Sequence, residues 1–330
     1  MPRIRQQGFV LAVTLWILAI ITIGASYFAE RVAGSISLAR QSSEATQALL
    51  DISNTRAEIL FRLGTTHFSI HGLGPARDSA IALDNRPYRG TGRDIVRLQD
   101  TRGLINVNFV QPEMLLRLLG QAGVPAEKRD AMLDTLRDYT DTDSLRRLNG
   151  AEAVEYQAQG LPVPPNDWLV TPYQLQKIIG WREQALLWKD LRLAEIVTTA
   201  RVTSFNPNTA PREVLVALPG SSPELADRLI QARALSPFYN NVQMNAVVAG
   251  QATLDPETLD FFPADSIRVS FESGKIPWAL CYQVTLTPLA DHAPWRIDYY
   301  IKTGVASPAR NANEPLPVSA ALPASANAAL

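Results

Sequence analysis

Cysteine is almost absent from this chain, because Cys281 is the only one in 330 residues. A single thiol excludes an intramolecular disulfide, so packing or a bound metal must hold the fold in place of cross-links. Cys281 alternates with apolar neighbours in a strand-like segment. This context is typical of a small buried hydrophobic residue rather than of a reactive thiol.

Net charge and histidine are equally scarce. The formal net charge is −1 and the chain has three histidines, so it has no global attraction for nucleic acid or anionic lipid. None of the histidines lies in a nucleophile motif, and the sequence has neither a phosphate-binding loop nor a zinc-ligand pattern. We therefore do not expect an enzyme.

Charge is missing altogether from Phe9 to Ala29, a run of twenty-one residues. At ~1.5 Å rise per residue, a helix of this length can cross the ~30 Å hydrocarbon core of a membrane. Arg3 and Arg5 precede the run, which predicts a cytoplasmic N-terminus with the rest of the chain on the other side. A secretory signal peptide is the alternative, although its apolar region would span only about 7–15 residues.

Helical periodicity continues beyond the apolar run. From Glu30 to Leu63 there is no proline, and the only glycine is Gly34. Apolar residues recur at helical spacing from Leu49 to Leu63, including Ile52, Ile59 and Leu60. The sequence predicts one long helix that is amphipathic in its second half and ends at Gly64. Two helices broken near Gly34 are the alternative.

Two stretches of the central region match each other at an offset of one hundred residues. Each begins with Asn-x-Asn, at Asn106 and at Asn206, and continues into proline, glutamate and leucines. Asparagine stabilises turns, proline suits a first helical turn, and glutamate favours the positive end of the helix dipole. A second helical segment follows each stretch, at 125–139 and 223–235. The region is therefore predicted to be all-α, built of helix–turn–helix pairs.

The C-terminal third alternates apolar and polar residues with a period of two, in segments 267–272, 278–287 and 295–303. We expect a three-stranded antiparallel meander with one face in water and the other covered by the amphipathic helix. In the last segment the predicted dry face comprises Trp295, Ile297, Tyr299 and Ile301. Residues 64–92 are rich in turn-forming residues and are predicted to be loop.

An early strand near 94–107 and the late strands flank the helical region, so the sheet is discontinuous in sequence. We predict an α+β fold in which the long N-terminal helix packs on a small antiparallel sheet, with a large all-α domain inserted into it. The predicted parts are a head at 1–8, a membrane helix at 9–29, the rest of the helix at 30–64, a β domain at 65–105 and 265–305, an α-domain at 106–264 and a disordered tail at 306–330.

Acidic residues gather after the first predicted helix pair. Asp138, Asp141 and Asp143 lie within six residues, and Glu152 follows them. These carboxylates repel one another unless a cation neutralises them, and clustered oxygen ligands on a loop suit Ca²⁺. No glycine stands at the turn position of an EF-hand. The alternative is a solvated helix end with aspartate caps.

The stretch 206–233 resembles the helix-hairpin-helix segment of DNA-binding proteins such as competence factors. That motif needs the backbone amides of a Gly-x-Gly hairpin to face phosphate. Here the hairpin runs from Gly220 to Pro223 without the second glycine, and Glu224 and Asp227 add negative charge. A membrane-anchored DNA-binding protein is thus the alternative function. We interpret the segment as a helix-packing unit of helix-hairpin-helix or SAM-like type.

Five short motifs stand out along the chain. They are Gly8-Phe9 before the apolar helix, DTRGLINVN at 100–108, GAE at 150–152 after the acidic stretch, Gly-Trp at 180–181 and SFNPNTAPREVLVALPG at 204–220. Together they resemble the minor pseudopilin K (GspK) family of type II secretion systems. The resemblance implies that residues 1–8 are a prepilin leader. A prepilin peptidase would cut after Gly8 and methylate the new N-terminal Phe9.

One departure from ordinary pilins supports this resemblance. Most pilins and pseudopilins carry a glutamate at the fifth mature position, where it pairs with the N-terminal amine of the subunit ahead. This chain has Val13 there, as the GspK family typically lacks the glutamate. A buried, unpaired carboxylate in the membrane would be costly. The resemblance therefore implies a place at the pseudopilus tip, where the chain initiates or caps assembly for protein export across the outer membrane.

The resemblance also implies a calcium-binding α-domain with Asp138, Asp141, Asp143 and Glu152 as ligands, and Tyr139 replaces the family's usual Trp. The implied partners are minor pseudopilins of the I, J and H types, the major pseudopilin, the prepilin peptidase, and exported proteins or the outer-membrane secretin. The implied location is the inner membrane, with a single span and the bulk of the chain in the periplasm.

Overall fold

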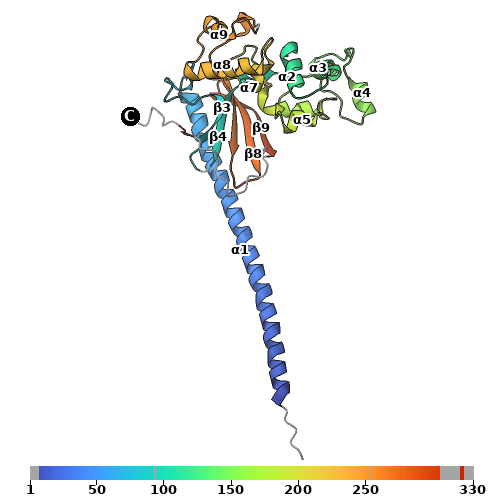
Figure 1. Ribbon diagram of the computed structural model, residues 1–330, viewed down its shortest axis with the longest axis vertical. Helices are drawn as coiled ribbons and strands as arrows, with labels where there is room; N and C mark the ends of the chain where they lie inside the picture. Colours follow the sequence, from blue (N-terminus) through green and yellow to red (C-terminus); the bar gives the residue numbers. More distant parts are fainter. Residues whose placement is uncertain (1–6, 93, 253, 305–319, 323–330) are drawn as a thin grey trace, which may run out of the picture.

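The computed structural model describes residues 7–92, 94–252, 254–304 and 320–322, and shows a folded head at the end of one long helix (Figure 1). Helix α1 (Gln7–Thr65) has 59 residues and is about 88 Å long at the usual helical rise. Gly34 does not interrupt it, and Gly64 lies in its last turn. The prediction of one continuous helix is confirmed.

The N-terminal part of α1 stands clear of the head (Figure 1). Every described side chain from residue 10 to residue 44 is exposed, and the first buried residue is Ala48. Within the described chain, α1 is the one helix that is long and apolar enough to cross a membrane. This exposed apolar surface is that of a single-pass membrane anchor.

The head is built on one sheet whose strands come from two distant parts of the chain. Its spatial order is β10-β3-β4-β7-β8-β9. The strands are β3 (Asp84–Arg89), β4 (Ile95–Asp100), β7 (Ser266–Glu272), β8 (Trp278–Leu286), β9 (Trp295–Gly304) and β10 (Ala320–Ala321). β4 and β7 pair antiparallel, from Ile95 opposite Glu272 to Asp100 opposite Ile267. The predicted discontinuous sheet is thus confirmed.

One face of this sheet packs on the C-terminal half of α1. The helix contributes Ala48, Ile52, Ile59 and Leu63 to a shared apolar core with the strands. Arg56 of α1 lies over the rings of Tyr282 and Tyr300, 5.5 and 5.6 Å from their centroids. A guanidinium over an aromatic face is attracted by the ring quadrupole. The predicted apolar stripe is correct at Ile52, Ile59 and Leu63, whereas Leu49 is exposed.

The other face of the sheet is not in water, contrary to the prediction. Arg268 of β7 is only 5% exposed, and its guanidinium donates to the carbonyls of Ala194 and Val197 at 2.7 and 3.2 Å. Gln283 of β8 is buried beside Thr198. The inserted helical region therefore covers this face. Alternation of polar and apolar residues cannot distinguish a side chain in water from one that bonds the backbone of another layer.

A β-bulge in β9 changes which residues face α1. Gln283 pairs with Tyr299, but the next residue of β8, Val284, pairs with Ile297, so Asp298 is an extra residue. Beyond the bulge, Tyr299 shares the face of Gln283, while Tyr300 packs against Arg56 of α1. The prediction that Trp295, Ile297, Tyr299 and Ile301 share one face was therefore wrong.

The turn-rich segment after α1 contains strands that the sequence did not predict. A small hairpin, β1 (Phe68–Ser69) with β2 (Gly72–Leu73), precedes β3. Pro87 lies within β3 although proline has no N–H for sheet hydrogen bonding. In the described part of the chain, the two-residue β10 is the one strand on the outer side of β3. β10 belongs to the tail that we predicted to be disordered, so that prediction is wrong for Ala320–Ala321. The other tail residues lie outside the described part of the chain.

The helical region lies between β4 and β7 in sequence. Its elements are η1 (Thr101–Gly103), β5 (Ile105–Asn106), α2 (Pro112–Gln121), α3 (Ala126–Thr140), α4 (Ala153–Ala158), η2 (Pro172–Lys177), α5 (Ala185–Lys189), α6 (Leu193–Ile196), β6 (Val197–Thr198), α7 (Arg212–Ala217), α8 (Pro223–Leu235), α9 (Asn241–Val248) and η3 (Pro256–Thr258). The helices predicted at 125–139 and 223–235 are confirmed as α3 and α8.

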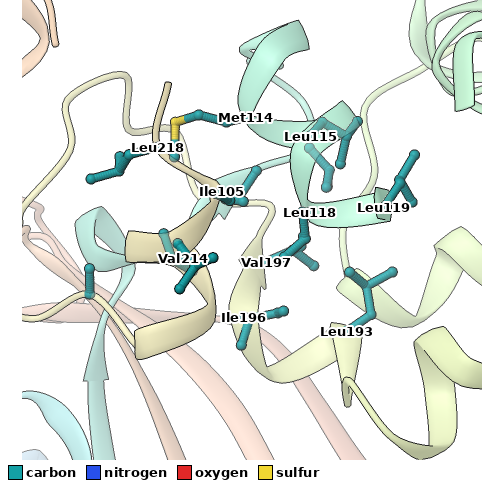
Figure 2. Packing of buried hydrophobic residues seen from close by; sticks show 14 of the residues in the cluster. Ile105, Met114, Leu115, Leu118, Leu119, Leu193, Ile196, Val197, Val214 and Leu218 are labelled. Carbon is teal, nitrogen blue, oxygen red and sulfur yellow. The ribbon is translucent and has the colours of Figure 1, made fainter. Parts of the chain in front are cut away.

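The two Asn-x-Asn stretches have the same structural role. Asn108 donates to the carbonyl of Leu169 and accepts from its N–H, both at 2.9 Å. Asn208 does the same with Phe238, at 2.9 and 2.8 Å. Helices α2 and α7 follow and meet in one core. Figure 2 shows Leu115 and Leu118 of α2, Val214 of α7 and Leu218 just after α7 around Ile105 and Val197.

Candidate functional site

The residues predicted to govern processing and assembly lie at the start of α1. Gly8 and Phe9 belong to its first turn. Val13 follows on an exposed helical surface with no acidic residue in the first turn. A valine at this place presents only apolar surface to lipid or to a neighbouring helix. The roles of Gly8, Phe9 and Val13 stay predictions.

The acidic residues lie where α3 ends, on the loop that leads to α4. Asp138 is completely buried, with a side-chain exposure of 0%. Its carboxylate accepts from the Arg147 guanidinium at 2.8 Å and from the Arg147 backbone N–H at 3.1 Å. A β-carbon on Gly150 would lie 1.8 Å from Asp138 Oδ2. The loop therefore needs a glycine at 150, because the carboxylate occupies the space of a side chain.

Arg147 joins this carboxylate to the next one along the chain. The same Nη1 atom contacts Asp138 Oδ1 at 2.8 Å and Asp141 Oδ2 at 2.5 Å. Ion pairs of this kind are strong where one partner is desolvated, as Asp138 is. Arginine is thus the cation between these two carboxylates in the structure. Sequence reasoning missed it because it considered only the acidic residues.

Two carboxylate oxygens of this loop are buried without a hydrogen-bond partner, namely Asp141 Oδ1 and Glu152 Oε1. Glu152 is 6% exposed, and its backbone N–H donates to Glu155 Oε2 at 2.9 Å. Burial, followed by the charges of Asp138, Asp141 and Asp143, raises the pKa of the Glu152 carboxyl above its ordinary value. Each buried, unpaired carboxylate oxygen carries a desolvation cost that a cation would offset.

The four predicted ligands do not converge on one point. Among the described residues, no three histidine, cysteine, aspartate or glutamate side chains form a group that could hold a metal ion. Asp143 is exposed, and its carboxylate accepts from the N–H of Leu145 at 2.8 Å, as an aspartate turn does. These side chains therefore carry the oxygen ligands that Ca²⁺ prefers. In this structure, however, the Arg147 guanidinium lies between the carboxylates of Asp138 and Asp141.

A second buried carboxylate, Asp100, lies at the junction of the sheet and the helical region. Its Oδ1 accepts from the N–H groups of Arg102 and Ala264 at 3.0 and 2.9 Å. Its Oδ2 accepts from Asn206 Nδ2 and Thr209 Oγ1 at 2.9 and 2.7 Å. The four donors come from the start, the middle and the end of the helical region. One side chain therefore links all three places. This role could not be predicted from sequence, because an aspartate at the end of a strand is ordinary.

The hairpin between α7 and α8 lacks the chemistry of a phosphate site. Gly220 has a φ of 73°, so it fills the left-handed position of the turn. Pro223 opens α8 and removes one N–H donor. Arg212 and Asp227 pair across the hairpin at 2.6 Å. Negative charge at this end of α8 opposes a nucleic-acid backbone, which argues against the DNA-binding alternative.

A long apolar N-terminal helix whose far half packs on an antiparallel sheet defines a pilin-type, membrane-anchored subunit. Two family models, each described as type II secretion system protein K, match residues 94–198 and 205–260. The first range includes β4 and η1 as well as the unit that begins at Asn106, and the second begins one residue before Asn206. The chain belongs to this family and is a minor pseudopilin of type II secretion.

The fold agrees with this assignment. The chain is similar to one in the crystal structure of the GspK-GspI-GspJ complex from the type 2 secretion system of enterotoxigenic Escherichia coli. The TM-score is 0.57 at 17% identity, and the similarity covers 80% of this chain and 98% of the other. No curated protein matches the chain. The α+β fold predicted from the sequence is therefore confirmed.

Proposed function

We propose that this minor pseudopilin occupies the tip of the type II secretion pseudopilus, where it initiates or caps assembly. The observation that carries the proposal is the size of the helical region beside the sheet at the end of α1 (Figure 1). A domain of this bulk would obstruct stacking of a further subunit above it. Val13 supports the same placement, because a subunit with none ahead needs no carboxylate for pairing.

The chain is inserted in the inner membrane through α1, with its N-terminus in the cytoplasm and its head in the periplasm. Arg3 and Arg5 on the N-terminal side of the apolar run support this orientation. Prepilin peptidase would remove residues 1–8 and methylate Phe9. The role is structural rather than catalytic, and the head is available to exported proteins or the outer-membrane secretin.

The partners are minor pseudopilins of the I, J and H types, followed by the major pseudopilin. The outer face of α1 is the surface on which a neighbouring helix would pack. Leu50 and Phe61 are large, apolar and more than half exposed there, although they lie on the part of α1 that carries the head. They lie eleven residues apart, which places them on one side of a helix. Apolar surface of this kind is typical of an interface.

We therefore expect Leu50→Arg with Phe61→Arg to prevent co-purification with the I-type and J-type minor pseudopilins. Burying two charges in an interface core costs about 2 kcal/mol or more, equivalent to at least ~30-fold in affinity. The measurement is affinity capture of the tagged full chain from detergent-solubilised membranes. Leu145→Arg is the control, because Leu145 is an exposed leucine of the helical region, 77% exposed against 54% for Leu50 and 57% for Phe61. Unchanged capture by the double variant would contradict the proposed interface, and no capture by the unaltered chain would contradict the proposed partners.

The second part of the proposal is that the acidic loop binds Ca²⁺. Asp141 and Glu152 supply the two buried oxygens without partners, and Asp138 and Asp143 are the remaining candidate ligands. Bound Ca²⁺ would neutralise carboxylates that otherwise repel one another and would fix the loop between α3 and α4. The alternative is a loop without bound metal, in which Arg147 alone holds the carboxylates.

Calcium should raise the melting temperature of the full chain in detergent, measured with Ca²⁺ and with EDTA. At ~100-fold excess over Kd a ligand adds about 2.7 kcal/mol, which corresponds to roughly 5–11 °C for a domain of this size. Glu152→Gln should abolish this increase. Asp130→Asn, at an exposed carboxylate of α3, should retain it. An identical melting temperature in both buffers would exclude calcium as a ligand.

A further inference from the structure

Arg147 occupies an unusual place in the acidic loop. Its guanidinium contacts two carboxylates, one of them fully buried, yet 38% of its own side chain is exposed. The neighbouring Arg146 instead pairs with Glu155 on the surface at 3.0 Å. Of these two adjacent arginines, only Arg147 thus enters the cluster that contains Asp138 and Asp141.

One guanidinium does not neutralise this cluster. Four carboxylates lie on the loop, at Asp138, Asp141, Asp143 and Glu152, against the single charge of Arg147 within it. Glu152 is more than nine-tenths buried with Oε1 unpartnered, and Asp141 Oδ1 is likewise buried without a partner. The loop therefore retains a demand for positive charge with Arg147 in place.

We propose that Arg147 is a displaceable internal cation, which holds the Asp138–Asp141 pair when no divalent ion is present and leaves when Ca²⁺ binds. This inference rests on the calcium site proposed above and adds a competitor encoded in the chain itself. It also explains why the described carboxylates do not converge. In the arginine-bound arrangement, the space and two of the lone pairs that an ion would use are already taken.

The physical basis is competition between two cations for the same oxygens. A dication attracts these carboxylates more strongly than a monovalent guanidinium at equal distance, because the Coulomb energy scales with charge. The long, partly exposed arginine side chain can move its charge into water at modest cost. The apparent calcium affinity then equals the intrinsic affinity multiplied by the fraction of chains in which Arg147 has left the carboxylates. Arg147 thereby sets the calcium concentration at which the loop changes state.

The test compares Arg147→Gln with Arg146→Gln in the full chain in detergent, by isothermal titration with CaCl₂. Both variants lose one positive charge at adjacent positions of one loop, so they share any general charge effect. Arg147→Gln should bind calcium at least ~10-fold more tightly than the unaltered chain, which corresponds to ~1.4 kcal/mol of removed competition. Arg146→Gln should stay within ~2-fold. In EDTA, Arg147→Gln should also melt at a lower temperature than Arg146→Gln, because Asp138 then lacks its counter-ion.

The outcomes distinguish this inference from the calcium proposal. If both variants and the unaltered chain bind calcium with equal affinity, the calcium site stands and the displacement of Arg147 is wrong. If Arg147→Gln binds more weakly, the arginine supports the site rather than competing for it, and the inference is also wrong. If no form binds calcium, the calcium proposal itself fails, and the displacement fails with it.

Discussion

Replacing Gly8 by valine should leave the leader on the chain and abolish secretion. The family resemblance assigns the peptidase cut to the bond after Gly8, and a β-branched side chain at this position would crowd the reacting carbonyl. A retained leader also keeps Arg3 and Arg5 at the end of α1. Drawing two arginines into the bilayer during assembly costs about 5–7 kcal/mol, equivalent to a reduction of more than ~1,000-fold in the assembled population.

The measurement is the intact mass of the purified chain, together with the amount of an exported protein in the culture medium. Gly24→Val is the matched control, since a β-carbon at Gly24 meets nothing within 4 Å. It places the same side chain in the same helix, and it should be processed normally. A mature mass in Gly8→Val equal to that of the processed unaltered chain would show that the leader is removed without a glycine at position 8, and would contradict this prediction.

The long helix could be predicted from the sequence because its signal is local and repeated. An uncharged run followed by an unbroken helical period leaves few alternatives over almost sixty residues. The same holds for the helix pairs, where Asn-x-Asn and a following proline fix turns within a few residues. Gly34 did not break α1, because a single glycine costs only about 1 kcal/mol in a helix.

The faces of the sheet could not be predicted, because they depend on contacts distant in sequence. Arg268 and Gln283 read as solvent-facing residues, yet the helical region supplies backbone carbonyls and Thr198 as their partners. The bulge at Asp298 inverts the pattern of β9 halfway along. β3 was missed because Pro87 and its turn-rich surroundings oppose a strand assignment locally. In each case tertiary contacts outweighed local preference.

The candidate site shows the same division. The carboxylates near the end of α3 were visible as a cluster in sequence, and their mutual repulsion followed directly. Arg147 was not predicted, because any of several nearby arginines could have filled the cluster, and only the loop geometry selects it. The role of Asp100 could not be predicted for a stronger reason. Its partners Asn206, Thr209 and Ala264 lie more than one hundred residues away.

Asp100→Ala should cause the largest loss of stability among single substitutions in the head. It leaves the N–H groups of Arg102 and Ala264 and the side-chain amide of Asn206 without this acceptor, and it leaves Thr209 Oγ1 only the Asn206 carbonyl at 3.5 Å. Hydrogen bonds to a buried charge contribute about 1.5–3 kcal/mol each, and partial relaxation leaves an expected loss of about 4 kcal/mol. For a domain of this size, the melting temperature should fall by roughly 8–16 °C.

Thermal unfolding of the full chain in detergent measures this loss. Asp260→Ala is the matched control, because Asp260 pairs with Arg102 at the same junction but its side chain is 34% exposed. Such an ion pair contributes only about 0–1 kcal/mol. A similar, small decrease in both variants would show that Asp100 does not hold the junction.

Limited proteolysis separates a weakened junction from a weakened fold. Asp100 contacts the chain where it enters the helical region and where it returns to β7. Losing it should therefore expose the segments 101–104 and 261–265 to cleavage, while α2 and α7 stay protected in their shared core. Cleavage distributed evenly over the helical region would instead mean that Asp100 stabilises the helices themselves. Cleavage confined to the junction would show that this one buried carboxylate holds the helical region in place on the sheet.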